Sequence, residues 1–412
     1  MTVATVNPEH ARQRSTDWID PANDITAGIL EKIHEIGPML RDHAKEADRN
    51  RVISDEVIEA IKGTGAWQIS TMARYGGFEG GARMLFETSR TLGYYLPSAG
   101  WVTTISNGSV MLLNRFDDEV LDEVFASDPS VGMASVFASP SGTARRDGDG
   151  WRITGSWPFA SNVMHSDWAL GILNIEGENG EEPGLGFALM HRDQFTIEDT
   201  WYVVGMRGTG SNTMVTKDLW IPENRLITFD RMMGTGFEMD PDANFARRQT
   251  PHLTMSTTIA APSIGATQAA LDFVREKALT RPVTFTCYDT QAGSGAFRHG
   301  IGQVSTRIDS AVLLLERSAD DIDRYALGTE PMPRDLRARH RGGIGHAVHE
   351  AALAINDLMW LHGTAAFAEF NPLAALWRDI NTGARHASIT APTNYELHGC
   401  GLLGTEYIAQ KL

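Results

Sequence analysis

The chain has 412 residues, of which 42% are hydrophobic and 21% charged, and its formal net charge is −16. This length suits two or three domains, and the composition is that of a globular enzyme with a large buried core. An acidic surface repels phosphate backbones and anionic lipid, which argues against nucleic-acid and membrane partners. The two cysteines, Cys287 and Cys400, fit no metal or redox spacing. They indicate a reducing compartment, which we take to be the cytoplasm.

The first part of the chain is predicted to be helical. Residues 1–22 are polar and are expected to form a flexible arm. From Asp24 to about Asn114, apolar residues recur at helical spacing. Ser54 stands before an acidic turn and is a candidate helix cap. We therefore expect an N-terminal α-helical domain over residues 23–130.

The periodicity then changes, and short apolar runs alternate with turn residues. This pattern predicts a central antiparallel β domain over residues 131–230. The dipeptides Asp149-Gly150 and Asn179-Gly180 favour hairpin turns, because their residues tolerate positive φ. The predicted strands are 131–138, 151–157, 168–175, 185–190, 195–198 and 214–221.

The last part, residues 231–412, is predicted to be a C-terminal four-helix bundle with an initial loop. The loop over 231–252 holds glycines, prolines and charges of both signs, and loops of this length in enzymes are often lids or binding segments. Small residues between Ala260 and Ala270 suit close helix packing or a subunit contact. The predicted helices cover 256–316, with an interruption at 293–295, then 335–362 and 374–389.

Some familiar motifs fail in their context. Residues 399–404 match the dinucleotide fingerprint, but only eight residues follow them, too few for a βαβ unit. His346 and His349 lie three apart on a predicted helix and could share a ligand face, but two surface or half-buried histidines are the favoured interpretation. Glu31 and His34 match half of a di-iron pattern whose second copy is missing. The sequence therefore predicts no metal site and no nicotinamide site.

Two segments of the β domain carry the strongest functional signal. Gly150-Trp151-Arg152-Ile153-Thr154-Gly155-Ser156-Trp157-Pro158-Phe159-Ala160-Ser161 combines a strand, an aromatic pair and a hydroxyl. Gly205-Met206-Arg207-Gly208-Thr209-Gly210-Ser211 is a glycine-rich turn before another strand. Together with Gly265-Ala266-Thr267-Gln268-Ala269-Ala270-Leu271-Asp272, these motifs resemble the acyl-CoA dehydrogenase superfamily over about residues 25–405. The resemblance implies an α+β fold with an N-terminal helical domain, a central antiparallel β domain and a C-terminal helical bundle.

Two chemistries compete within that superfamily. Dehydrogenases remove an α proton from an acyl-CoA with a glutamate, commonly in a Tyr-Glu-Gly-Thr sequence after Arg-Asp. No such sequence follows Arg378-Asp379, and His386 stands near the place of that glutamate. Residues 155–161 and His386 instead resemble the oxygenase components of two-component flavin monooxygenases, which include phenol hydroxylases, indole oxygenases and dibenzothiophene monooxygenase.

This resemblance predicts the reaction. Reduced flavin and O2 are expected to hydroxylate a small aromatic or heteroaromatic substrate of phenol or indole type, through a C4a-hydroperoxyflavin. The alternatives are an acyl-CoA dehydrogenase or flavin oxidase, an N- or S-oxygenating member of the same fold, and a non-catalytic scaffold. The resemblance also implies reduced FMN or FAD supplied by a separate NAD(P)H-dependent flavin reductase. It further implies a homotetramer in which one subunit helps to hold the flavin of another.

The resemblance assigns roles to individual residues. His386 is expected to act as a base or as a proton donor, because an imidazole with an ordinary pKa near neutrality can do either. Ser161 and Asn107 complete the predicted catalytic set. Residues expected to hold the flavin are Trp157, Phe159, Ser161, Ser139, Arg281 and Arg298. Residues expected to bind an aromatic substrate are Trp101, Trp377 and Ser109, together with the 231–252 loop.

Each assignment has a structural alternative. The aromatic pair 157 and 159 stacks on the flavin or belongs to the core of the sheet. The serine hydroxyls bind the edge of the flavin or are satisfied by backbone, and the arginines bind the flavin phosphate or form surface ion pairs. Many family members also carry a second histidine after a Trp-Val pair. Here no histidine follows Trp101-Val102, and Asn107 or Ser109 is expected to take the place of that histidine.

Overall fold

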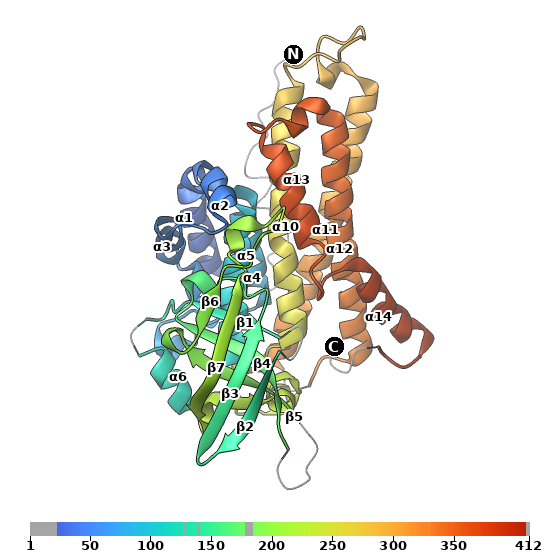
Figure 1. The fold of residues 1–412 in the computed structure, drawn as a ribbon. Coiled ribbons are helices and arrows are strands. Elements are labelled where there is room, and N and C mark those ends of the chain that lie inside the picture. The colour runs from blue at the N-terminus through green and yellow to red at the C-terminus, as the bar shows by residue number, and fades with distance from the viewer. Residues whose placement is uncertain (1–22, 127, 138–140, 178–183, 329, 409–412) are drawn as a thin grey trace.

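The computed structural model describes residues 23–126, 128–137, 141–177, 184–328 and 330–408 (Figure 1). Three sequence predictions lie outside these residues: the arm over 1–22, the turn at 179–180 and Ser139. Within the described residues, helices precede and follow one sheet, in the order that the sequence predicts. The division into three separately folding domains stays a prediction.

The N-terminal helices pack around a fully buried one. All residues of the helix Pro97–Leu113 are buried, because small and apolar residues occupy every face of it. Ser54 stands at the start of a helix as predicted, but its hydroxyl is buried without a hydrogen-bond partner, so the predicted capping bond is wrong. The helices are α1 (Asn23–Asp42), α2 (Ala44–Asn50), α3 (Asp55–Gly63), α4 (Ala82–Tyr95), α5 (Pro97–Leu113) and α6 (Asp118–Val124).

The described strands form one eight-stranded sheet in the order β6-β7-β3-β2-β4-β5-β8, with β1 beside β4. Most neighbouring strands are antiparallel, as predicted, whereas β1 and β2 each run parallel to β4. All six predicted strands are present. The sequence missed β2, in which only Ala144 is buried, and the three-residue β8. The strands are β1 (Met133–Val136), β2 (Gly142–Asp147), β3 (Gly150–Trp157), β4 (Trp168–Ile175), β5 (Gly184–His191), β6 (Thr196–Glu198), β7 (Thr213–Pro222) and β8 (Leu226–Thr228).

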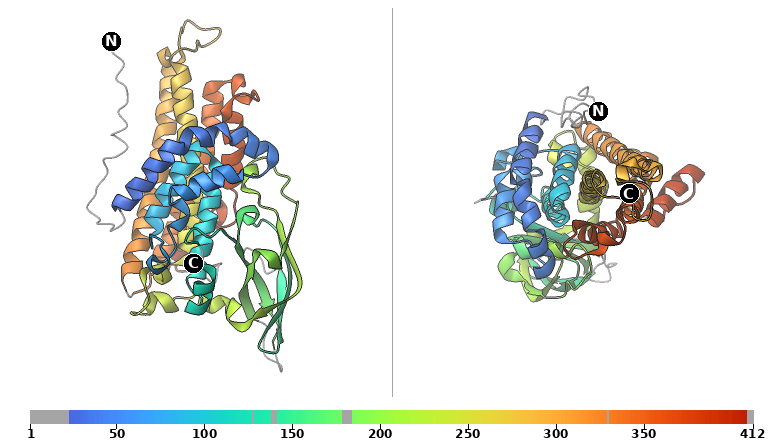
Figure 2. Two further views of the ribbon diagram at one scale, coloured as in Figure 1. Left: turned by 90° about the vertical axis from the view of Figure 1, so that its left-hand side faces the viewer. Right: turned by 90° about the horizontal axis from the view of Figure 1, so that it is seen from above.

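Long helices build the C-terminal part. Viewed from above, α10 stands between the N-terminal helices and the pair α11 and α12 (Figure 2). The predicted helix 335–362 is confirmed to within one residue. The predicted helix 374–389 ends early, at Gly383, and α14 was not predicted at all. The helices are α7 (Phe229–Met233), α8 (Gly236–Met239), α9 (Phe245–Arg248), α10 (Pro251–Ala278), α11 (Gly295–Leu327), α12 (Arg334–His362), α13 (Pro372–Gly383) and α14 (Ala391–Leu403). In the described part of the chain, no helix has both the length and the apolarity needed to cross a bilayer.

The segment 231–252 is not the open loop that the sequence predicted. It contains three short helices, α7 to α9, and the first residues of α10. The guanidinium of Arg115, at the end of α5, is buried beneath it. Arg115 donates to the carbonyls of Met232, Gly234 and Gln249, at 2.7, 3.0 and 2.8 Å. One buried cation thus holds both ends of the segment, which argues against a freely hinged lid.

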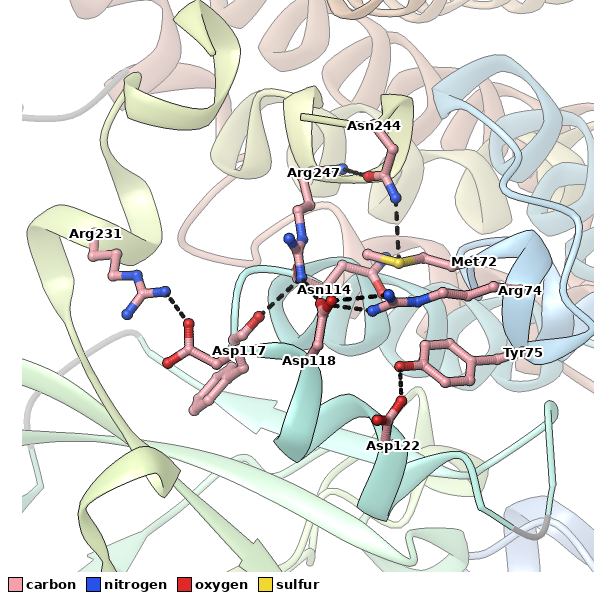
Figure 3. A network of polar contacts seen from close by, with 11 residues as sticks. Met72, Arg74, Tyr75, Asn114, Asp117, Asp118, Asp122, Arg231, Asn244 and Arg247 are labelled. Carbon is pink, nitrogen blue, oxygen red and sulfur yellow. Dashed lines mark hydrogen bonds and ion pairs between the residues drawn. The ribbon is translucent and has the colours of Figure 1, made fainter. Parts of the chain in front are cut away.

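Surface ion pairs fasten the same segment to the link between α5 and α6 (Figure 3). Arg231 contacts Asp117 at 2.5 Å, and Arg247 contacts Asp118 at 2.7 Å. Arg74 approaches Asp118 from the other side, also at 2.7 Å. Hydrogen bonds from Arg74 and then Arg247 hold the pKa of Asp118 far below its usual range. These pairs are exposed and add little stability individually, so Arg115 is the main anchor.

Replacement of this anchor should be costly. Burial lowers the pKa of Arg115 to about 10, so the side chain is still charged at neutral pH. Arg115→Met leaves three carbonyls without their donor, and we expect it to lower the free energy of unfolding by about 3 kcal/mol or more. Urea denaturation measures this change. The exposed Arg145→Met should change stability by less than about 0.5 kcal/mol, and equal losses in the two variants would contradict the assignment.

Candidate active site

The two segments singled out in the sequence meet in space. Ser161, just after β3, lies 2.7 Å from Ser211 at the end of the glycine-rich turn, oxygen to oxygen. Ser211 lies 2.6 Å from the hydroxyl of Thr209, which donates to the carbonyl of Met206 at 2.9 Å. On the other side, the indole N–H of Trp101 on α5 donates to Ser161 at 3.2 Å. These contacts form a continuous buried chain from α5 into the sheet.

The direction of this chain follows from the number of protons. Each hydroxyl has one proton to donate, and that of Thr209 goes to a carbonyl, which can only accept. Ser211 must therefore donate to Thr209, and Ser161 to Ser211. The Ser161 oxygen then accepts from Trp101 and keeps one lone pair unused. Ser161 is thus set up to accept one further hydrogen bond.

Backbone strain surrounds Ser161. Phe159 and Asn162 have φ angles of 61° and 68°, in the left-handed region that few non-glycine residues adopt. The strained turn is pinned by backbone hydrogen bonds from Ala160 to Asn212 and from Asn162 to Thr209. Such strain persists only where neighbours enforce it, and it is common at binding sites. Phe159 is 71% exposed beside Trp201, so its ring is free to pack against a ligand.

Trp157 has no such freedom. Its side chain is fully buried, and its indole N–H donates to the carbonyl of Ile172 at 2.6 Å. Glycines at three positions make room for the ring: a Cβ added at Gly142, Gly155 or Gly171 would lie within 2.8 Å of it. The structure favours the core alternative for Trp157, and the predicted stacking on a flavin is withdrawn.

His386 faces the same chain from the C-terminal part. The sequence placed it on a late helix, whereas the structure places it in the turn between α13 and α14. Its ring meets the Trp101 ring edge-on, with centroids 5.5 Å apart and planes at 72°. Gly383 lets the end of α13 lie close to α10 and α5, since a Cβ there would lie 2.9 Å from the Ser263 hydroxyl and 3.4 Å from the Trp101 ring.

The titration expected for His386 needs correction. The sequence argument assumed a pKa near neutrality, whereas burial lowers the pKa of His386 to about 4. The imidazole is therefore neutral at physiological pH, and it does not provide a cationic proton donor there. Its Nδ1 lies 2.9 Å from the Ser388 hydroxyl and 3.3 Å from the Ser388 backbone nitrogen.

Helix α13 is locked onto the glycine-rich turn. Asp379 accepts from the backbone N–H of Met206 at 2.6 Å. Arg378 donates to the carbonyl of Val204 at 3.0 Å. No side chain fits between the two segments, because a Cβ at Gly205 would lie 2.2 Å from the carbonyl oxygen of Arg378. These contacts keep the His386 turn and the Ser161 chain in one place.

Other predicted site residues have structural duties. The Asn107 amide is fully used: it accepts from the backbone of Ser70 at 2.9 Å and donates to the carbonyls of Ala66 and Thr103. We therefore withdraw it from the catalytic set. Ser109 donates to the carbonyl of its own helix at Ile105 and lies 2.8 Å from the Ser135 hydroxyl on β1.

Trp377, predicted to bind substrate, bonds instead within the bundle. Its indole donates to Asn356 on α12 at 2.7 Å, and its ring lies edge-on to Phe367. None of its described hydrogen bonds or ring contacts reaches Trp101 or His386. The structure thus does not bring Trp377 into the centre.

Arg281 and Arg298 flank the connection between α10 and α11, at the end of the bundle away from the sheet (Figure 1). Arg281 donates to the ring and carbonyl of His362, at 2.8 and 3.1 Å. Arg298 donates to the carbonyls of Ala292 and Gly293. In the described contacts neither arginine pairs with a carboxylate, which leaves both charges available to an anion.

The sequence argument missed Thr209, Ser211 and Ser135. The first two belong to the glycine-rich turn that was singled out, but no pattern in the sequence shows that Ser211 contacts Ser161 and that Thr209 contacts Ser211. A run of hydroxyl residues after glycines was the available signal. It gains meaning only when the register of β3 and β7 is known.

Comparisons with known proteins agree with this geometry. Residues 257–391 match the family described as acyl-CoA dehydrogenase, C-terminal domain. The solved structure of XiaF from Streptomyces sp., in complex with FADH2 and glycerol, is 36% identical with a TM-score of 0.93, covering 96% of this chain and 100% of that one. The oxygenase subunit HsaA of a flavin-dependent monooxygenase from Rhodococcus jostii (strain RHA1) is 29% identical over 91% of this chain and 98% of its own length.

A further relative is named for its cofactor. The oxygenase component of the FADH(2)-dependent resorcinol hydroxylase from Rhizobium sp. (strain MTP-10005) is 26% identical over 92% of this chain and 94% of its own length. The fold, the site and these relatives define a flavin-dependent oxygenase. The chain belongs to the flavin-dependent monooxygenases that have the acyl-CoA dehydrogenase fold.

The lock between α13 and the turn makes a prediction for stability. Burial raises the pKa of Asp379 to about 7, so between pH 4 and 7 the folded carboxyl keeps a proton that the unfolded one has lost. Its burial therefore costs stability increasingly as pH rises through this range. Asp379→Asn keeps the acceptor for Met206 but cannot ionise. Relative to the wild type, the variant should gain stability from pH 4 to 7.5, by at most about 4 kcal/mol.

Chemical denaturation of both proteins across this pH range measures the difference. A stability difference that does not change with pH would contradict the raised pKa. A variant that is equally destabilised at every pH would show that the amide does not fit the site.

Proposed function

We propose that this protein is the oxygenase component of a two-component flavin-dependent monooxygenase that hydroxylates a small aromatic compound of phenol or indole type. The observation that carries the proposal is the meeting of Trp101, Ser161 and His386 at one centre. The names of the relatives support both the reduced flavin and the aromatic substrate. Such an oxygenase receives its reduced flavin from a separate reductase, which we propose to be NAD(P)H-dependent.

The residues at the centre fit a reduced flavin. A reduced tricyclic ring has N–H groups at its edge and a broad apolar face. The unused lone pair of Ser161 complements such a donor, and the exposed ring of Phe159 offers a flat apolar surface. When bound, reduced flavin supplies the activation of O2, and the protein supplies orientation and exclusion of water. The FADH2 in the names of two relatives favours FAD over FMN.

The chain's own side chains suit an aromatic substrate. The indole of Trp101 and the neutral imidazole of His386 form a wall without formal charge. The described hydrogen bonds and ring contacts of Trp101, Ser161 and His386 involve no carboxylate. This disfavours the acyl-CoA dehydrogenase alternative, because that chemistry needs a glutamate base beside the flavin.

The direct test supplies reduced FAD, O2 and a panel of phenols and indoles. We expect a hydroxylated product, with little hydrogen peroxide when the correct substrate is present. His386→Ala should lower the yield of product by roughly 10²-fold, because a positioned acid–base or hydrogen-bonding group contributes at least that factor. Product yield and peroxide are measured in the same reaction.

Two controls separate folding from chemistry. Thermal unfolding of His386→Ala should show a folded protein. Ser318, a buried serine on α11, pairs with Thr257 and has no described hydrogen bond to Trp101, Ser161 or His386, so Ser318→Ala should react like the wild type. Reduction of a dye by an acyl-CoA, without any hydroxylated product, would contradict the proposed function.

We further propose a homotetramer in the cytoplasm, in which Arg281 and Arg298 of one subunit bind the flavin phosphate of another. Large hydrophobic side chains are exposed at the same end of the bundle as these arginines, and the bond from Arg281 to His362 brings the two connections of that end together. An exposed apolar surface of this kind supports the proposed subunit interface. The exposed side chains are Leu279, Phe285, Trp360, Phe367 and Phe370.

A charge placed on this surface should break the assembly. Trp360 and Phe370 are 87% and 78% exposed, so a charge at either position leaves the fold of one subunit intact. We expect the double variant Trp360→Glu, Phe370→Glu to sediment as a smaller species. It should also bind reduced flavin at least tenfold more weakly, because the proposed flavin site needs a second subunit. Met239→Glu, at another exposed apolar position on α8, is the control and should leave the assembly intact. Unchanged sedimentation of the double variant would contradict the interface.

A further inference from the structure

Arg341 is a buried cation that the site described so far does not use. It lies on α12 and is 2% exposed. Burial lowers its pKa to about 10, so it is still charged at neutral pH. Its described hydrogen bonds lead to the Asn394 amide, the Ser388 carbonyl, the Ser256 hydroxyl and the His252 ring, and none of them leads to a carboxylate. A buried guanidinium ordinarily needs a carboxylate to offset its lost hydration. A charge retained at this cost calls for a function.

The partners of Arg341 converge on the turn that carries His386. One terminal nitrogen donates to the carbonyl of Ser388 at 2.8 Å, and Nε donates to the side chain of Asn394 at 2.5 Å. The Asn394 amide in turn donates to the same Ser388 carbonyl at 3.2 Å and to that of Thr390 at 2.8 Å. Arg341 on α12 and Asn394 on α14 therefore both donate to the carbonyl of Ser388, and together they fix its position.

Ser388 in turn contacts the imidazole of His386 through its backbone and its side chain. Its backbone N–H points at Nδ1 of His386 at 3.3 Å, and its hydroxyl lies 2.9 Å from the same atom. A backbone N–H can only donate, so Nδ1 must be the acceptor. The single proton of the neutral ring then belongs on Nε2. The other tautomer would turn two hydrogens toward each other at Nδ1.

We propose that Arg341 and Ser388 are positioning residues that fix His386 in one neutral tautomer, so that it presents an Nε2–H donor at the reacting centre. This inference rests on the proposed function, and it decides between the two roles that the sequence left open for His386. The ring stabilises an oxygen atom that gains negative charge, by a hydrogen bond that needs no proton transfer. It does not take the proton of a phenol or indole through Nε2, because that atom already carries one.

The tautomer is directly measurable in protein labelled with ¹⁵N-histidine. We expect His386 to show a pyridine-type Nδ1 and a pyrrole-type Nε2 signal, assigned by their loss in His386→Asn. Arg341→Met frees the carbonyl of Ser388, and Ser388→Ala removes the shorter contact to Nδ1 and leaves only the backbone N–H at 3.3 Å. In both variants, the two signals should therefore shift part of the way toward the values of a tautomer mixture. The ratio of product to consumed reduced FAD should fall about tenfold, while the KM for reduced FAD stays the same.

Two further variants guard against a trivial loss of folding. Ser388→Thr keeps the hydroxyl, so its ¹⁵N signals and its ratio of product to consumed reduced FAD (the coupling) should both match those of the wild type. Ser318→Ala removes a buried hydroxyl that pairs with Thr257 instead, and it should change neither. If Arg341→Met does not fold, the comparison of Ser388→Ala with Ser388→Thr decides the question.

The outcomes separate this inference from the proposed function. A wild-type signal of the Nδ1–H tautomer overturns the inference, as do unchanged signals and coupling in Ser388→Ala. If no aromatic compound is hydroxylated but the signals shift as expected, the positioning is upheld and the proposed function is wrong.

Discussion

The structure depends on a hydrogen-bond chain that joins α5 to the sheet. Trp101, Ser161, Ser211 and Thr209 follow one another from indole to carbonyl, and every donor in the chain is used once. Each neutral bond contributes only about 1 kcal/mol, but a buried link that loses its partner leaves a desolvated polar group at a larger cost. The chain therefore fixes a single arrangement, in which Ser161 keeps one acceptor position facing the site.

The C-terminal part of the chain supplies the other half of the centre. Asp379 fastens α13 to the glycine-rich turn, and the helix ends at Gly383, where it lies against Trp101. His386 then follows in a turn held by α12 and α14. Because burial keeps the imidazole neutral, the centre works by hydrogen bonding and apolar contact. Such an environment suits an uncharged aromatic substrate, and it limits the access of water to the reacting atoms.

Much of this could be predicted from the sequence, because strong periodicity and glycine-rich motifs are local signals. Helix α12 and strand β4 were predicted to within one residue. Ser161, His386 and Trp101 were each singled out as site residues, and the structure places both Ser161 and His386 in contact with Trp101. The predictions that were wrong concern features that depend on tertiary contacts. Burial of Arg115 organises the 231–252 segment, the three glycines around Trp157 place it in the core, and the amide of Asn107 is consumed by backbone.

Protonation states were the least predictable feature. The ordinary pKa of an imidazole gave no hint that His386 stays neutral down to about pH 4, since its burial arises from elements far apart in the chain. A crystal structure of the protein soaked anaerobically with reduced FAD would show directly whether Ser161 and His386 face the flavin. We expect the tricyclic ring to lie against Phe159, with an edge N–H on the Ser161 oxygen and with Nε2 of His386 facing the reacting side. A ring bound elsewhere, with Ser161 and His386 both out of hydrogen-bonding reach, would contradict it.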